Sequence, residues 1–97
     1  MPGKVKSYMN YSRKDRITSK LSKELTPLFL EVIDESHYHQ DHGVENSSTR
    51  ETHIKVKIIS RVFKGKNLIQ SHRIINELLQ EEFLSGLHAL TIDAKSE

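Results

Sequence analysis

Histidines and carboxylates are the residues of this sequence that offer chemistry. Its 97 residues include six histidines and 13 aspartates and glutamates, and no cysteine. Without cysteine, the chain forms no disulfide and supplies neither a thiol nucleophile nor a thiolate ligand to a metal. Any metal or acid-base chemistry must therefore rest on the imidazoles and the carboxylates.

Three of the histidines, His37, His39 and His42, lie close together in a polar segment of the chain. On a flexible loop, their imidazoles could close on one metal ion. A self-contained zinc or copper site is only weakly indicated, because no fourth ligand stands at a defined spacing. The alternative interpretation is that a long hydrated loop simply carries polar residues.

The other three histidines fall on predicted helices and strands. His53 opens a predicted strand and His72 lies on the apolar stripe of a predicted helix, so we expect structural roles for both. His88 begins the last predicted strand and shares its parity with Leu90 and Ile92. From the residues alone, such a histidine is most often a half-buried side chain with a satisfied hydrogen bond.

An independent catalytic site is not indicated. The sequence contains no Walker loop, no dinucleotide fingerprint and no pattern of nucleophile and base. The paired acids at 34–35 and 81–82 are adjacent in sequence, which separates their directions on a strand or a helix. We therefore expect a protein that is not an enzyme.

A helix is predicted near the start of the chain, after a basic and mobile tail over residues 1–12. Ser12 with Asp15 resembles an N-cap, and the apolar residues that follow recur at helical spacing. Pro27 disfavours helical geometry at Thr26, so the helix should end there. The residues of the stripe are Ile17, Leu21, Leu25 and Leu28.

Two strands are predicted next, over residues 29–34 and 53–60. The first is short, apolar and β-branched, and the second alternates cleanly between apolar and lysine side chains. Between them lies a polar stretch, which we expect to be a long mobile loop over residues 37–52. The simplest arrangement is an antiparallel pair.

Two helices and a third strand complete the prediction. Apolar residues recur at helical spacing from Asn67 to Phe83, and the polar stretch at 80–82 divides this segment into a long and a short helix. Gly86 is the expected C-cap, and residues 87–92 then alternate as a strand. A three-stranded sheet covered on one face by helices follows, in a single α+β domain over residues 13–95.

Charge and hydropathy narrow the classes of partner. Residues 1–24 and 54–73 are basic, whereas residues 25–53 and the tail from residue 74 are acidic, which favours oriented docking on a charged partner. The longest apolar run, at residues 28–30, is far too short to span a membrane, and no secretion signal is visible. We expect a cytoplasmic protein, a monomer alone or a weak homodimer through a free sheet edge.

Several motifs in this order resemble the BolA family, over about residues 17–95. They are Leu30-Glu31-Val32, Asp34-Glu35-Ser36, Glu51-Thr52-His53, Phe63-Lys64-Gly65-Lys66, Gln70-Ser71-His72-Arg73-Ile74-Ile75-Asn76, Glu81-Glu82 and Gly86-Leu87-His88-Ala89-Leu90. The resemblance implies the class II KH-like fold, αββααβ with a mixed sheet. This order agrees with the one predicted from periodicity.

The resemblance also implies a function. His88 matches the position through which BolA proteins ligate a 2Fe-2S cluster shared with a monothiol glutaredoxin, whose cysteine and bound glutathione supply the sulfur ligands. His39 matches the second ligand, with His37 and His42 as alternatives. The helix that carries His72, Arg73 and Asn76 is implied to dock the glutaredoxin. The isolated chain is expected to bind no cluster, in agreement with its lack of cysteine.

Nucleic-acid binding is the second hypothesis, since family members are described as transcription regulators. Lys55, Lys57, Lys64, Lys66 and Arg73 lie in a run without acids and could contact DNA or RNA phosphates. A KH module, however, clamps the backbone with a G-x-x-G loop, and the matching junction here reads Leu79-Gln80-Glu81-Glu82. Its carboxylates would repel phosphate.

Overall fold

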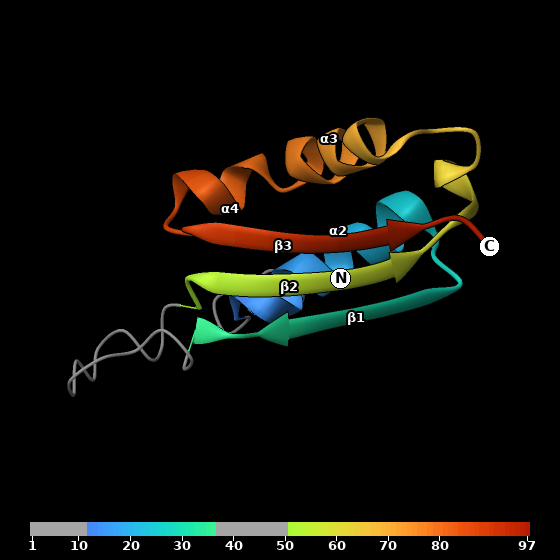
Figure 1. Cartoon of the computed structure of the whole chain (residues 1–97). Helices are drawn as coiled ribbons and strands as arrows, with labels where there is room; N and C mark the ends of the chain where they lie inside the picture. Colours follow the sequence, from blue (N-terminus) through green and yellow to red (C-terminus); the bar gives the residue numbers. More distant parts are fainter. Residues whose placement is uncertain (1–11, 37–50) are drawn as a thin grey trace.

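The computed structural model describes residues 12–36 and 51–97, so that the predicted tail and loop, with His37, His39 and His42, lie almost entirely outside the described residues. Figure 1 shows one layer of helices against a three-stranded sheet. The elements are α2 (Arg13–Leu25), β1 (Phe29–Asp34), β2 (His53–Ile59), the 3-10 helix η4 (Arg61–Phe63), α3 (Leu68–Leu78), α4 (Gln80–Leu84) and β3 (Ala89–Lys95).

Helix α2 begins and ends where the sequence predicts. The Ser12 side chain accepts a hydrogen bond from the Asp15 backbone N–H, and the Asp15 side chain accepts one from the Ser12 N–H, which together form a capping box. The helix ends at Thr26, which has a left-handed φ of 37° before Pro27. Ile17, Leu21 and Leu25 of the apolar stripe are buried, and they pack the helix against the sheet. Leu28, which was predicted to belong to the stripe, lies beyond the end of the helix and is 56% exposed.

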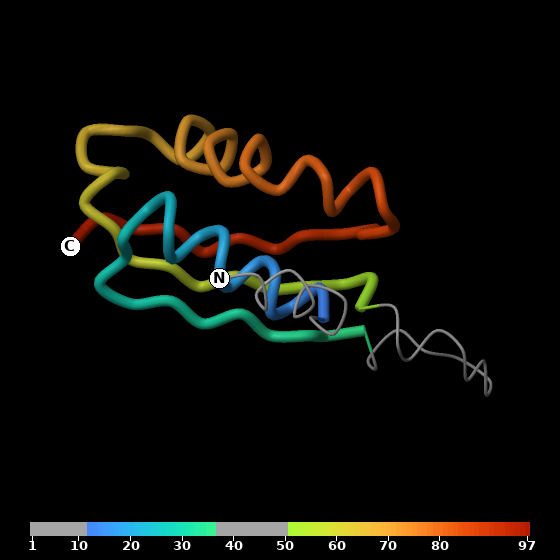
Figure 2. Tube along the Cα trace, turned by 180° about the vertical axis from the view of Figure 1, so that it is seen from behind, coloured from blue at the N-terminus to red at the C-terminus, as the bar shows by residue number. Residues whose placement is uncertain are grey.

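The sheet has the order β1-β2-β3, with β2 in the centre. Strand β1 pairs antiparallel with β2, as predicted, and β3 pairs parallel with β2. The buried residues Ile54, Val56 and Ile58 of β2 alternate with half-buried Lys55 and Lys57. The helices therefore cover one face of the sheet, and the tube in Figure 2 shows the same two layers from behind.

The third strand differs in extent from its prediction. The sequence predicts residues 87–92 with His88 at the start, whereas β3 runs from Ala89 to Lys95. The strand starts late because the chain turns at Gly86, which has a φ of 127°. After this turn, Leu87 is buried in the core and His88 is exposed. The strand continues past Ile92 because β2 offers pairing partners up to the Ile59 to Lys95 pair.

Helices α3 and α4 form the crossover from β2 to β3. Asn67 caps α3, and its side chain and that of Gln70 exchange hydrogen bonds with each other's backbone N–H groups. Leu79, with φ of −103° and ψ of 17°, separates α3 from α4, close to the predicted break. Ile75 and Leu79 join the core with the α2 stripe and the inward residues of the sheet. Among the described residues, no helix combines the length and the apolar character needed to cross a bilayer.

Candidate functional site

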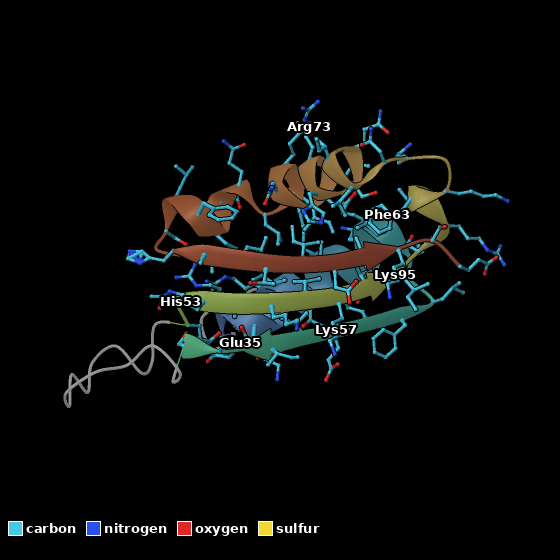
Figure 3. All side chains as sticks on the ribbon, in the orientation of Figure 1. Glu35, His53, Lys57, Phe63, Arg73 and Lys95 are labelled. Carbon is cyan, nitrogen blue, oxygen red and sulfur yellow. The ribbon has the colours of Figure 1, made fainter. Side chains whose placement is uncertain are left out.

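His53 and His88 lie side by side at one end of the sheet. Strands β2 and β3 are parallel, so they start at the same end, and His53 pairs with Ala89, the residue after His88. The two imidazole ring centroids are 6.1 Å apart. Figure 3 labels His53 at this end, next to the turn from α4 into β3. The structure therefore builds a pair of imidazoles from residues that are far apart in the sequence.

His88 is exposed, and its backbone is fixed. The His88 N–H donates to the Thr52 carbonyl at 2.8 Å, and the Ala89 N–H donates to the same oxygen at 3.1 Å. The residue-based expectation of a half-buried side chain is therefore wrong, because the side chain precedes the strand and does not follow its inward parity. An exposed imidazole on a fixed backbone is accessible to a metal carried by another molecule.

His53 is half-buried, and its Nδ1 lies 2.9 Å from Thr52 Oγ1. The donor in this contact is either Nδ1 or the Thr52 hydroxyl, according to the tautomer of His53. Sequence reasoning gave His53 only a structural role and missed its proximity to His88. The signal that could have found it was the helical crossover between the last two strands, which implies parallel strands that start together.

The segment with the three other predicted ligands also starts at this end of the sheet. Ser36 is the last described residue before it, and Ser36 Oγ accepts a hydrogen bond from the His53 N–H at 3.1 Å. His37, His39 and His42 themselves lie outside the described residues. Within residues 12–36 and 51–97, no cluster of three or more His, Cys, Asp or Glu side chains is arranged to hold a metal ion.

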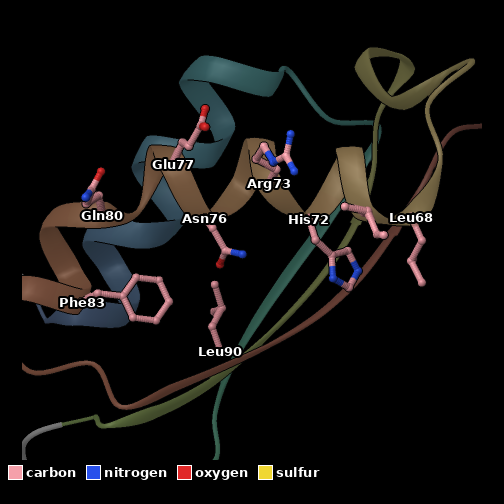
Figure 4. A pocket seen from close by; sticks show the side chains of 9 residues that line it. Leu68, His72, Arg73, Asn76, Glu77, Gln80, Phe83 and Leu90 are labelled. Atoms are coloured by element: carbon pink, nitrogen blue, oxygen red, sulfur yellow. The ribbon is translucent and has the colours of Figure 1, made fainter.

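The three predicted partner-binding residues line one groove between α3 and β3. His72, Arg73 and Asn76 lie along its wall, and its volume is about 780 Å³. Figure 4 shows their side chains with the other lining residues, Leu68, Ile69, Glu77, Gln80, Phe83 and Leu90. Leu68 and Ile69 are about two-thirds exposed, at 65% and 67%. The groove thus combines apolar surface with a guanidinium, an imidazole, a carboxylate and two amides.

His72 is half-buried at this groove, in agreement with the core-edge position predicted for it. Its Nε2 atom is buried and has no hydrogen-bond partner among the described residues. A buried polar atom without a partner is unfavourable for the stability of the chain.

A partly buried ionic network joins α2 to α4 and is absent from the sequence predictions. The Glu82 carboxylate accepts hydrogen bonds from Arg13 Nη1 and Arg16 Nε, each at 2.8 Å. Burial acts to raise the pKa of Glu82, but the hydrogen bond from Arg16 and the charges of Arg16 and Arg13 outweigh it, and the pKa is lowered. Of the two carboxylates at the junction of α3 and α4, only Glu81 is exposed.

The basic residues of the second hypothesis are spread over three surfaces. Lys55 and Lys57 lie on the sheet face opposite the helices, Lys64 and Lys66 lie on the exposed turn before α3, and Arg73 is exposed on α3. In Figure 3, Lys57 and Arg73 lie on different layers of the molecule. The structure does not gather these cations into one continuous face.

The fold defines a class of small α+β domains with αββααβ order, and two histidines lie together at one end of its sheet. The family model for BolA-like proteins matches residues 21–97. The chain belongs to the BolA-like family. It is similar to the solved structure of BolA1 from Arabidopsis thaliana, with 44% identity, a TM-score of 0.81, and coverage of 89% of this chain and 93% of that one.

Other proteins that are similar to this chain carry different names. SufE-like protein 1 of Arabidopsis thaliana is 49% identical over 88% of this chain, and chloroplastic BOLA1 of the same plant is 44% identical over 88%. The chain spans only 24% and 54% of these two proteins. The DNA-binding transcriptional regulator BolA of Vibrio cholerae is 41% identical over 80% of this chain and 69% of its own length.

Proposed function

We propose that this protein is an adaptor that docks a monothiol glutaredoxin and co-ligates a 2Fe-2S cluster through His88, in cluster trafficking or iron-linked regulation. The observation that carries the proposal is the exposed imidazole of His88, with a second imidazole 6.1 Å away, at a fixed end of the sheet. The donor set fits, because a chain with no cysteine can offer such a cluster an imidazole nitrogen but no thiolate.

The division of ligands follows from this donor set. The partner would supply the sulfur ligands, from its own cysteine and from glutathione, and His88 would supply an imidazole nitrogen. Imidazole in place of thiolate on one iron raises the reduction potential of a 2Fe-2S centre. Either His53 or His39 is the candidate for a second nitrogen, His53 because of its position beside His88 and His39 because of the family resemblance.

Docking is assigned to the groove of α3 and β3. Arg73 is exposed there, and its planar guanidinium suits the carboxylates of glutathione or of the partner. His72 and Asn76 line the same groove. Ligation and docking are thereby placed at different residues, so that they can be tested separately.

The test uses the purified protein mixed with a monothiol glutaredoxin, glutathione, iron and sulfide. We expect visible absorption and circular dichroism that differ from those of glutaredoxin alone. His88→Ala should return the spectrum to that of glutaredoxin alone and still bind the cluster-free glutaredoxin by calorimetry. Arg73→Ala should weaken that binding instead. A mixed-complex spectrum unchanged by His88→Ala would overturn the ligand assignment.

The second nitrogen ligand is identified in the same mixture. His53→Ala and His39→Ala are compared with wild type, and the variant that changes the spectrum without restoring that of glutaredoxin alone identifies the ligand. His72→Ala is the matched control, because it removes an imidazole at the groove and not at the end of the sheet. It should alter the affinity for cluster-free glutaredoxin and leave the spectrum of the saturated complex unchanged.

DNA or RNA binding is the second candidate function, and one observation favours it. The BolA relatives of Vibrio cholerae and Escherichia coli, 41% and 39% identical to this chain, are named DNA-binding transcriptional regulators. The basic turn with Lys64 and Lys66 is the exposed cationic loop that would contact phosphates. Retardation of a DNA probe that weakens with salt, and that Lys64→Glu with Lys66→Glu abolishes, would support it. Retardation unchanged by the double variant would exclude this loop.

A further inference from the structure

We propose that the first turn of α2 is a positioning device that sets the spacing of His53 and His88. Its purpose rests on the proposed function, because a shared metal centre needs its ligands held at one geometry. Two short segments lead into the strands: residues 85–88 lead into β3 and residues 51–53 lead into β2. Neighbouring residues of the same α2 turn bind both segments.

Arg13 holds the segment that leads to His88. Its side chain is only 9% exposed, and its Nη1 donates to Glu82 Oε1 at 2.8 Å, to the Glu82 carbonyl at 3.0 Å and to Ser85 Oγ at 3.0 Å. Its Nη2 donates to the Ser85 carbonyl at 3.2 Å. One planar guanidinium therefore fixes a carboxylate, a hydroxyl and two carbonyls at the C-terminal end of α4.

The chain from Ser85 to His88 has little freedom beyond this contact. The Leu87 N–H donates to the Glu82 carbonyl at 2.9 Å, and the Leu87 side chain is buried. Gly86 has a left-handed φ of 127°, and a Cβ at this position would lie 3.1 Å from Arg13 Nη2. Arg13 thus packs directly on the turn that aims His88.

The next residue of α2 holds the segment that leads to His53. The Lys14 backbone N–H donates to Glu51 Oε1 at 2.6 Å, so that the Glu51 carboxylate sits at the N-terminus of α2. Glu51 has a left-handed φ of 53°, so the chain turns at this residue just before β2 begins at His53. The Glu51 charge also interacts with Arg16, whose pKa is raised chiefly by its hydrogen bond to Glu82.

Thr52 joins the two segments. Its carbonyl accepts from the N–H groups of His88 and Ala89, and its hydroxyl lies 2.9 Å from His53 Nδ1. Arg13 and Lys14 are consecutive residues of a capped helix whose stripe is buried. The register of β2 against β3 brings the two imidazoles together, and the α2 turn holds both segments that lead into these strands, although the histidines are far apart in the sequence.

The test measures the histidine pair in the free protein, without iron. Ring proton signals of His53 and His88, and the nuclear Overhauser effect between the rings, are compared in wild type, Arg13→Lys and Glu51→Ala. Lysine keeps the charge of Arg13 but cannot reach the carboxylate and Ser85 together. Lys23→Ala is the matched control, since it changes an exposed side chain in the last turn of the same helix, away from both segments.

We expect Arg13→Lys and Glu51→Ala to shift both ring signals and to weaken the effect between the rings. Lys23→Ala should leave these signals in place. Unchanged ring signals in the two folded variants would overturn the proposal. If Arg13→Lys does not fold, Glu51→Ala decides alone, because it removes one hydrogen bond at the end of the helix.

The mixed complex with glutaredoxin then separates this proposal from the proposed function. Both positioning variants should alter the circular dichroism of the complex, and less strongly than His88→Ala. If the variants move the rings but His88→Ala leaves the complex spectrum unchanged, the positioning device stands and the ligand assignment fails. If the rings do not move and His88→Ala returns the spectrum to that of glutaredoxin alone, the positioning proposal fails and the ligand assignment stands.

Discussion

Glu82 is a carboxylate whose environment could not be predicted from its neighbours. It lies in a polar run, Gln80-Glu81-Glu82, that is typical of an exposed helix end, and yet its side chain is only 11% exposed. Arg13 and Arg16 stand three positions apart on one face of α2 and so reach the same carboxylate. Breaking a buried pair leaves an uncompensated charge, so this residue matters for stability.

The pH dependence of stability follows from the direction of the Glu82 pKa. Burial would raise this pKa, but the hydrogen bond from Arg16 and the two guanidinium charges lower it below its ordinary value of 4.5. A carboxyl with a lowered folded-state pKa stabilises the protein above the unfolded-state pKa, and this contribution is lost as the pH falls through the folded-state value. The contribution of Glu82 should therefore be full at neutral pH and decline below about pH 4.5.

Urea unfolding of wild type and Glu82→Gln from pH 7 to pH 3 tests this. We expect the variant to lose about 1–3 kcal/mol of unfolding free energy at neutral pH. The difference between the two proteins should shrink as the pH falls below the ordinary glutamate range. Glu81→Gln, on the exposed side of the same helix, is the control and should stay close to wild type. A difference that does not change with pH would contradict the ion-pair explanation.

At the scale of elements, the helices and strands have local causes and were predictable. The spacing of Ile17, Leu21 and Leu25 predicts α2, and the alternation of apolar residues and lysines predicts β2. Contacts between distant segments were not predictable. The pairing of Arg13 with Glu82 joins residues 69 positions apart, and the proximity of the two histidines depends on the register of β2 against β3.

Alanine substitutions at the two glycines with positive φ, Gly65 and Gly86, show how tightly the turn before β3 is constrained. Gly65 has φ of 80° with nothing within 4 Å of an added Cβ, whereas Gly86 has φ of 127° and an added Cβ would lie 3.1 Å from Arg13 Nη2. Gly65→Ala should cost about 1–2 kcal/mol, from backbone strain alone. Gly86→Ala should cost more, because the backbone is more strained and Arg13 must move.

Chemical denaturation of the two alanine variants gives both free energies, and the ring signals of His88 give a second comparison. Gly86→Ala should shift those signals, and Gly65→Ala, at the opposite end of the sheet, should not. Equal losses of stability with unchanged histidine signals would mean that the turn tolerates displacement. In that case the contact between Arg13 and Gly86 would not be a constraint on the site.

At the scale of the whole molecule, two parts of the domain are held by different forces. Strand β2 is bonded on both sides, and its inward residues Ile54, Val56 and Ile58 are at most 1% exposed. Helix α4 has five residues, its Leu84 is 80% exposed, and its one buried residue is Glu82. The core is thus stabilised by apolar burial, whereas α4 is held by the Arg13 and Arg16 ion pairs and by one partly buried apolar residue, Phe83.

Native-state hydrogen exchange should separate these two parts. Amides of β2 should exchange only through global unfolding, while those of α4 should also exchange through a local opening of lower free energy. After correction for intrinsic exchange rates, the gap in protection should widen below about pH 4.5, because Glu82 is then protonated and its ion pairs weaken. In Glu82→Gln the gap should already be wide at neutral pH. Equal protection of β2 and α4 across this range would show that the end of the sheet bearing His88 unfolds only with the core. It would also show that the ion pairs of Glu82 do not govern a separate local opening.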